Sequence, residues 1–307
     1  MANSDIHFPD DSCWNLDDDA AYLAWRRVKL DQASGLVEQS TPVVIGDMGA
    51  LTSVERAALM ARCAVSNGVL YREQTPTQDE SSMSAKLRQF ANALGLQIAE
   101  KHRSAGQDGV VALQVSESLR QKRYIPYSSK KMNWHTDGYY NAPDQKIRAM
   151  VLHCVRAAND GGVNQFLDNE IAYIRLRDEN PDYIRALMHP QAMTIPANEE
   201  PDGDNRPASI GPVFAVDPLT DTLEMRYTAR TRSIAWRDDA ATRAAVDFLT
   251  GLLGSDDPLI QTVKMQAGTG ILCNNSLHNR TGFDGDTPEN SARLMMRVRF
   301  HNRISKD

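Results

Sequence analysis

The spacing of apolar and polar residues changes near residue 108. Before that point, apolar residues recur every three to four positions, as on one face of a helix, from Asp17, from Ser53 and through residues 82–102. The short apolar run at 41–45 predicts a strand between the first two helices. Residues 1–108 are therefore predicted to form a mainly helical part of the protein.

From residue 109 onward the chain shows short runs of β-branched and aromatic residues divided by turn residues. Predicted strands lie at 109–116, 132–139, 147–156, 163–168, 192–197, 212–216, 222–229, 260–265, 270–274 and 292–301. Helical spacing returns near 169–188 and 238–254, and residues 196–212, rich in Pro, Gly, Asp and Asn, indicate a loop. This pattern is typical of a β-sandwich or barrel. We expect one domain over 1–307, an α+β fold whose β-rich core spans 109–303 and carries packed helices.

Composition narrows the class of protein. With 307 residues, 41% hydrophobic and 24% charged, the chain is long and apolar enough to bury a sizeable core. A net charge of −6 argues against a general nucleic-acid surface. No apolar stretch suits a membrane span or a secretion signal, so we expect a cytoplasmic protein without a membrane partner. The scattered cysteines form no CxxC pair and are expected to be free thiols: Cys13, Cys63, Cys154 and Cys273. A homo-oligomer is compatible with the sequence.

Candidate chemistry begins with His135 and Asp137. On a strand, two residues at this spacing point to the same face. An imidazole and a carboxylate together suit a divalent metal of intermediate hardness such as Fe(II). Alone the pattern is weak, because Asp137–Gly138 is also a common turn dipeptide and His135 could be a hydrogen-bonded loop histidine.

His278 would complete a triad of two histidines and one carboxylate. Such a triad leaves three metal positions open, enough for a bidentate cosubstrate and dioxygen. The cosubstrate most often used is 2-oxoglutarate, whose distal carboxylate needs a buried cation. Arg293 and Arg297 follow His278 by 15 and 19 residues in a predicted strand. The alternative is a histidine hydrogen-bonded near the Asn274–Asn275 turn and arginines on a solvated strand face.

The chain resembles the taurine dioxygenase and clavaminate synthase-like group of Fe(II)/2-oxoglutarate dioxygenases over about residues 110–303. The resemblance is carried by the order and spacing of five residues: His135, Asp137, His278, Arg293 and Arg297. The resemblance implies a double-stranded β-helix, or jelly roll. It also implies that iron is bound by His135, Asp137 and His278.

The same resemblance implies the contacts of the cosubstrate. Arg293 would bind the distal carboxylate of 2-oxoglutarate, and Arg297 would lie near its keto acid end. Asn164 follows Gly161–Gly162 at the place where the family usually has a threonine that contacts the cosubstrate. An amide can also donate a hydrogen bond to a carboxylate.

The implied reaction is oxidation of an unactivated carbon by dioxygen, with 2-oxoglutarate converted to succinate and carbon dioxide. The carboxylate ligand Asp137 favours hydroxylation over halogenation, because its loss would open a halide site. Arginines and aromatic residues concentrate in 226–237, which favours a small anionic substrate. Candidate substrate contacts are Tyr139, Tyr140, Arg226 and Arg230. Equally, these arginines could pair with acidic runs, the tyrosines could be structural, and 196–212 could be a lid or a plain surface loop.

Three alternatives stay open. The same oxidant could carry out desaturation or ring closure within the family. A zinc hydrolase could use the same three ligands to activate water, but it would not need Arg293 and Arg297. A catalytically silent jelly roll could bind a ligand or a protein, and its metal residues would then tolerate substitution.

Overall fold

The computed structural model describes residues 8–9, 11–38, 41–77, 79–100, 109–116, 124–198, 205–284 and 293–304. Its helices are α1 (Ala20–Glu38), α2 (Ser53–Ser66), α3 (Glu80–Ala93), α4 (Asn169–Glu179), α5 (Pro181–Met188) and α6 (Ala240–Leu253). Its strands are β1 (Val43–Ile45), β2 (Gly68–Glu73), β3 (Val111–Leu113), β4 (Met132–His135), β5 (Ala149–Arg156), β6 (Asn164–Leu167), β7 (Met193–Ile195), β8 (Ser209–Gly211), β9 (Phe214–Asp217), β10 (Thr222–Met225), β11 (Ala235–Trp236), β12 (Gln261–Val263), β13 (Thr269–Cys273), β14 (Leu277–Arg280) and β15 (Leu294–Phe300).

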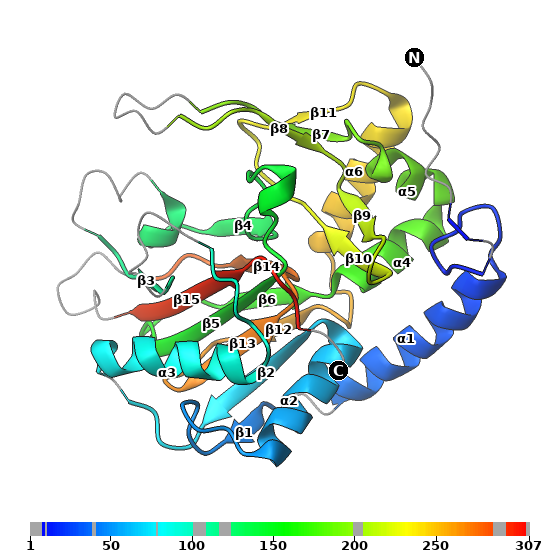
Figure 1. The fold of residues 1–307 in the computed structure, drawn as a ribbon. Coiled ribbons are helices and arrows are strands. Elements are labelled where there is room, and N and C mark those ends of the chain that lie inside the picture. The colour runs from blue at the N-terminus through cyan, green and yellow to red at the C-terminus, as the bar shows by residue number, and fades with distance from the viewer. Residues whose placement is uncertain are drawn as a thin grey trace.

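Two sheets form the centre of the molecule (Figure 1). The larger has the order β1-β2-β13-β5-β15-β3, and the smaller has the order β12-β6-β14-β4. All pairs in them are antiparallel except β1 with β2. Buried apolar side chains of both sheets, including Met295 of β15 and Phe166 of β6, form one cluster between them. Two antiparallel sheets around a shared core are the arrangement expected of a jelly roll.

Strand β15 is buried on both faces. Leu294, Met296 and Val298 belong to the apolar cluster on the outer side of the large sheet, together with α2 and α3. Since side chains alternate along a strand, Arg297 and Arg299 lie on the face of Met295, toward the space between the sheets. Both arginines are buried, so the alternative of a solvated strand face is wrong.

Helices cover the outer surfaces of the sheets (Figure 1). Helix α2 begins after Thr52, whose side chain accepts from Glu55 N at 3.2 Å while the Glu55 carboxylate accepts from Thr52 N at 2.8 Å. This reciprocal cap satisfies two backbone donors at the start of the helix. Helices α4, α5 and α6 pack together on the other side, with Trp14 and Tyr22 in the same apolar cluster. None of the helices in the described ranges is long and apolar enough to cross a membrane.

Several elements differ from the predicted ones. Strands β2, β8, β11 and β14 have no counterpart among the predictions, and β8 lies inside the predicted loop 196–212. The helix predicted at 82–102 ends at Ala93, just before Gly95 with φ 79°. The strand predicted at 132–139 ends at His135, so Asp137 lies in the following turn. In addition to its helices, the first part of the chain contributes β1 and β2 to the large sheet.

Candidate metal centre

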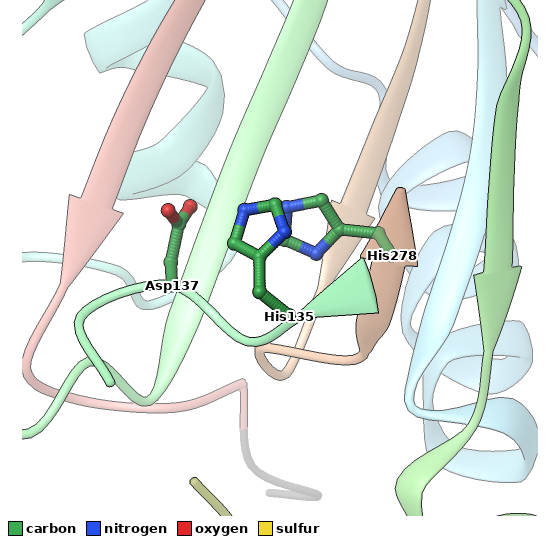
Figure 2. A group of neighbouring side chains, drawn as sticks. All are labelled: His135, Asp137 and His278. Carbon is green, nitrogen blue, oxygen red and sulfur yellow. The ribbon is translucent and has the colours of Figure 1, made fainter. Parts of the chain in front are cut away.

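His135, Asp137 and His278 meet at one point (Figure 2). His135, the last residue of β4, is the register partner of His278 on β14, and the two ring centroids are 4.2 Å apart. Asp137 follows two residues later and extends its carboxylate to the same space. One possible ligand atom from each of the three side chains lies within 4.8 Å of the others, and all three residues are buried. The fold therefore brings the three predicted metal ligands together.

Both imidazoles are oriented by backbone carbonyls. Nδ1 of His135 lies 2.8 Å from the oxygen of Asn133, and Nδ1 of His278 lies 2.9 Å from that of Ser276. A carbonyl only accepts, so each Nδ1 carries the proton and each Nε2 presents its lone pair. Burial lowers the pKa of His135 to about 3 and also lowers the pKa of His278. Both rings are thus neutral near pH 7, the state that binds metals.

The Asp137 carboxylate is held by two cations. Nη1 of Arg297 lies 3.0 Å from Oδ1, and Nη1 of Arg299 lies 3.5 Å from the same oxygen. Burial alone would raise the pKa of Asp137, but the nearby positive charges, Arg297 first, bring this pKa below its usual range. Within the described part of the chain, the buried Oδ2 atom has no hydrogen-bond partner. Two free imidazole nitrogens and one free carboxylate oxygen are a donor set that fits Fe(II).

Arg293 lies just before β15 and is a buried cation. Its guanidinium carbon is 4.8 Å from the ring centroid of Phe283, and a Cβ on Gly162 would lie 3.5 Å from its Nε. No hydrogen bond or ion pair joins Arg293 to another residue in the described ranges. Burial lowers its pKa. A desolvated guanidinium without an anionic partner favours binding of an anion, and a carboxylate matches its planar fork.

Asn164 lies in the same region. Its Nδ2 donates to Gly162 O at 3.2 Å, and its register partner on β14 is Arg280. Arg280 is buried, and its guanidinium carbon also lies 4.8 Å from the Phe283 ring. Because Arg280 and His278 are two residues apart on β14, both side chains lie on one face of that strand. Arg280 is a functional candidate that the sequence analysis missed.

Two of the predicted substrate contacts, Tyr139 and Arg230, form a pair beside His135. The Tyr139 ring centroid is 6.3 Å from that of His135, and Nη1 of Arg230 donates to the Tyr139 hydroxyl at 3.1 Å. Arg230 is exposed. The Tyr139 ring also packs edge-to-face on Tyr140, with centroids 5.1 Å apart. This aromatic pair therefore forms a wall beside the candidate metal centre.

Arg226 and the Tyr140 hydroxyl are engaged within the protein. Arg226 donates to the carbonyl oxygens of Tyr139 at 2.8 Å and Ser209 at 2.8 Å, and burial lowers its pKa to about 10. The Tyr140 hydroxyl accepts from Nη1 of Arg299 at 3.1 Å. These contacts tie the segment after β4 to its surroundings. A substrate role for Arg226 and Tyr140 stays a prediction.

A cavity of about 210 Å³ adjoins this segment. It reaches Asp137, Tyr139 and Arg226, but neither histidine of the triad lines it. Two of the cations in its lining, Lys146 and Arg148, are both paired with Glu224. The cavity therefore borders the segment that carries Asp137, and the lysine in its lining is paired.

Comparison with known proteins agrees with this geometry. A model of the family described as taurine catabolism dioxygenase TauD, TfdA family, matches residues 33–299. The chain belongs to this family, which uses Fe(II), 2-oxoglutarate and dioxygen. The resemblance to the taurine dioxygenase group is thereby confirmed, as are the cofactor and cosubstrate expected from it.

One curated relative has a more specific name. The uridine-5′-phosphate dioxygenase of Amycolatopsis sp is 31% identical to this chain over 167 residues. The match covers 51% of this chain and 56% of that protein, so the chain spans little more than half the length of the relative.

Solved structures show the same fold. The oxygenase OrfP with Fe, succinate and (3S)-hydroxy-L-Arg superposes with a TM-score of 0.60 at 17% identity, over 92% of each chain. Asparagine oxygenase with Fe(II), hydroxyasparagine and succinate gives 0.59 at 14% identity, over 89% of this chain and 90% of that one. A taurine dioxygenase from Burkholderia xenovorans gives 0.56 at 19% identity, over 85% and 89%. The predicted jelly-roll fold is confirmed.

Proposed function

We propose that this chain is an Fe(II)- and 2-oxoglutarate-dependent dioxygenase that hydroxylates an unactivated carbon of a small anionic molecule and produces succinate and carbon dioxide. The observation that carries the proposal is a buried triad with three free ligand atoms in a chain that also buries Arg293 without an anionic partner among the described residues. A zinc hydrolase would need the triad but not the buried arginine. A silent binding module would need neither.

Each residue has a separate task. Iron would be bound by three atoms: Nε2 of His135, Nε2 of His278 and Oδ2 of Asp137. Together with 2-oxoglutarate, the bound iron would supply the chemistry that oxidises a C–H bond. Arg293 would bind the distal carboxylate of 2-oxoglutarate. Arg297 would keep Asp137 charged and lie near the keto acid end. Because Asp137 occupies the position that a halide would need, hydroxylation is favoured over halogenation.

Asn164 is the third proposed cosubstrate contact. Its amide is buried close to Gly162, the residue that lies beside Arg293. Nδ2 donates to Gly162 O, which leaves the second N–H of this amide for a carboxylate.

An anionic substrate is supported by two separate observations. Arg230 presents an exposed guanidinium next to Tyr139, whose ring lies beside His135. In addition, the Amycolatopsis relative is named for a substrate that carries a phosphate. Nucleoside monophosphates are therefore the first substrates to test, followed by amino acids, carboxylates and sulfonates.

An anaerobic titration of the metal-free protein with Fe(II) and then 2-oxoglutarate tests the proposal. We expect a weak visible charge-transfer band that needs both additions and that is lost in His278→Ala and weakened in Arg293→Ala. Iron binding without the band would refute the role of 2-oxoglutarate. Failure to bind any metal would leave a jelly-roll binding protein.

Mass spectrometry of the product separates reactions within the family. Hydroxylation adds one oxygen atom to the substrate, whereas desaturation or ring closure removes two hydrogens. A cytoplasmic location and a homo-oligomeric state stay predictions. Cell fractionation and light scattering, respectively, would test them.

A further inference from the structure

Asn275 binds both backbone polar groups of Asp137. Its Oδ1 accepts from Asp137 N at 2.7 Å, and its Nδ2 donates to Asp137 O at 3.0 Å. The second N–H of the same amide donates to Ile147 O at 2.7 Å. Asn275 is buried and stands 138 residues from Asp137 in the chain. The side chain of Asn275 thus makes the two backbone hydrogen bonds that a neighbouring strand would otherwise make with Asp137.

Asp137 needs such a partner because strand pairing does not reach it. Strand β4 ends at His135, and Asp137 leads into Gly138, whose φ is 66°. A Cβ on Gly138 would come within 2.5 Å of Ile147, so this turn lies closely against the segment that Asn275 also binds. His135 is positioned by its pairing with β14, whereas the backbone of Asp137 is positioned by the amide of Asn275.

The turn that carries Asn275 also orients His278. Asn275 has φ 52°, a conformation that asparagine adopts more readily than most residues. The next residue, Ser276, offers its carbonyl oxygen to Nδ1 of His278 at 2.9 Å. The turn is itself anchored, since Asn274 N and Ser276 Oγ donate to Asn67 O at 2.7 and 3.1 Å. Two candidate ligands from distant parts of the chain are therefore held by neighbouring residues of one turn.

We propose that Asn275 is a positioning residue of the metal centre, which sets the place of the Asp137 carboxylate relative to the two imidazoles. The proposal rests on the assignment of the triad as the iron site. Its physical basis is that a side chain with two donors and one acceptor matches one N–H and two carbonyl groups at the end of a strand. Partners that orient metal ligands in this way change metal affinity by about 10- to 100-fold when removed.

The test compares two neighbouring asparagines. Asn275→Gly removes the amide without strain, because glycine adopts a positive φ freely. Asn274→Ala is the matched control, since the Asn274 side chain also makes three hydrogen bonds, to Asn67 Oδ1, Ile304 O and Ile304 N, but touches no ligand. For each metal-free variant, the dissociation constant and visible spectrum of bound Co(II), as a probe of Fe(II), are measured together with the thermal unfolding temperature.

We expect Asn275→Gly to weaken Co(II) binding about 10- to 100-fold and to alter the Co(II) spectrum. Asn274→Ala should lower the unfolding temperature with Co(II) affinity within about twofold of the wild type. Equal Co(II) affinities in the two variants would overturn the proposal. If Asn275→Gly does not fold, Asn275→Asp decides, because it keeps the acceptor for Asp137 N but loses both donors.

The wild-type titration separates this proposal from the proposed function. A wild type that binds Co(II) but develops no charge-transfer band with Fe(II) and 2-oxoglutarate would refute the dioxygenase assignment, and the Co(II) comparison would still decide the role of Asn275. A wild type that binds no metal would overturn both.

Discussion

Nη1 of Arg297 lies 3.0 Å from Oδ1 of Asp137, and both side chains are buried. The charge of Arg297 is the first of the influences that keep the pKa of Asp137 low against the opposing effect of burial. Since Arg297 and Arg299 both act on Oδ1, the other oxygen stays available to a metal. This ion pair therefore keeps a buried candidate ligand ionised and leaves one oxygen atom for coordination.

Arg297→Gln should make metal binding sensitive to acid. Without this charge, the pKa of Asp137 rises, and each unit by which it exceeds the working pH costs about tenfold in metal affinity. We expect the Co(II) dissociation constants of wild type and variant to diverge as the pH is lowered from 7.5 to 5.5. Arg297→Lys keeps the charge and should restore most of the affinity at low pH. Identical pH profiles for the Gln and Lys variants would contradict this explanation.

Arg293 and Arg280 should contribute unequally to 2-oxoglutarate binding. Both lie against Phe283, but Arg280 also donates to Ser128 O at 3.0 Å, whereas Arg293 has no such contact in the described ranges. Burial and the charge of Arg293 lower the pKa of Arg280 to about 9, so Arg280 stays cationic near pH 7. Loss of a charged hydrogen-bonding partner, about 1.5–3 kcal/mol, predicts a roughly 10- to 150-fold weaker complex for Arg293→Ala.

For Arg280→Gln we expect a smaller loss, of about threefold to tenfold, since part of its hydrogen bonding is to backbone. Pyruvate, a 2-oxo acid without the distal carboxylate, provides the control ligand. Its affinity, followed by the same charge-transfer band, should be nearly equal in wild type and both variants. A comparable loss for pyruvate would mean that the substitutions disturb the metal centre instead of the distal pocket.

The candidate ligands could be chosen from sequence by their residue types, by the short spacing of His135 and Asp137, and by the resemblance to the family. His135 and Asp137 supply an imidazole and a carboxylate two residues apart at the end of one strand. His278 follows downstream and precedes Arg293 and Arg297, in the order that the resemblance requires. The strand that carries His278 was not predictable in the same way. Its residues after Leu277 are His, Asn and Arg, a polar run typical of a loop, yet all of β14 is buried.

The supporting residues depend on contacts that the sequence does not display. Asn275 is an ordinary turn residue in sequence, and its partner lies 138 residues earlier. Arg299 is visible only as an arginine two positions after Arg297, while its contact with Tyr140 spans 159 residues. Neither contact is indicated by a repeating spacing of residues along the chain. Only the pairing of the strands brings these groups together, so the sequence pattern indicates the candidate ligands but not the contacts that orient them.

Acid should destabilise the metal-free protein partly through His153, a buried histidine outside the triad. Burial lowers the pKa of His153 to about 4, against about 6.5 in the unfolded chain. Below pH 6.5 the unfolded state therefore binds a proton that the folded state does not. The free energy of unfolding should fall by about 1.4 kcal/mol per pH unit from this residue between roughly pH 6 and 4.5, with no such loss above pH 7.

Urea unfolding of wild type and His153→Gln across pH 4.5–8 measures this contribution. Glutamine can still accept a hydrogen bond from Tyr71, whose hydroxyl lies 3.1 Å from Nδ1 of His153. The slope of stability against pH should be shallower in the variant by the amount given above, while the other buried histidines contribute to both proteins. Parallel curves would show that His153 is not a source of the acid sensitivity.

Arg230 should govern the affinity for an anionic substrate with little effect on the chemical step. Its guanidinium is exposed and bonded to Tyr139, whereas the triad is buried. A charged hydrogen bond formed equally in the ground state and the transition state affects KM but not kcat. For Arg230→Ala we expect KM for the anionic substrate to rise about 5- to 30-fold, as measured by succinate formation.

Arg243→Ala is the control variant. It removes an exposed arginine of helix α6 that is paired with Asp238, and it should leave KM unchanged. An uncharged analogue of the substrate should be turned over equally by wild type and Arg230→Ala; if the variant loses as much activity on that analogue, Arg230 supports the shape of the site and does not recognise the anion.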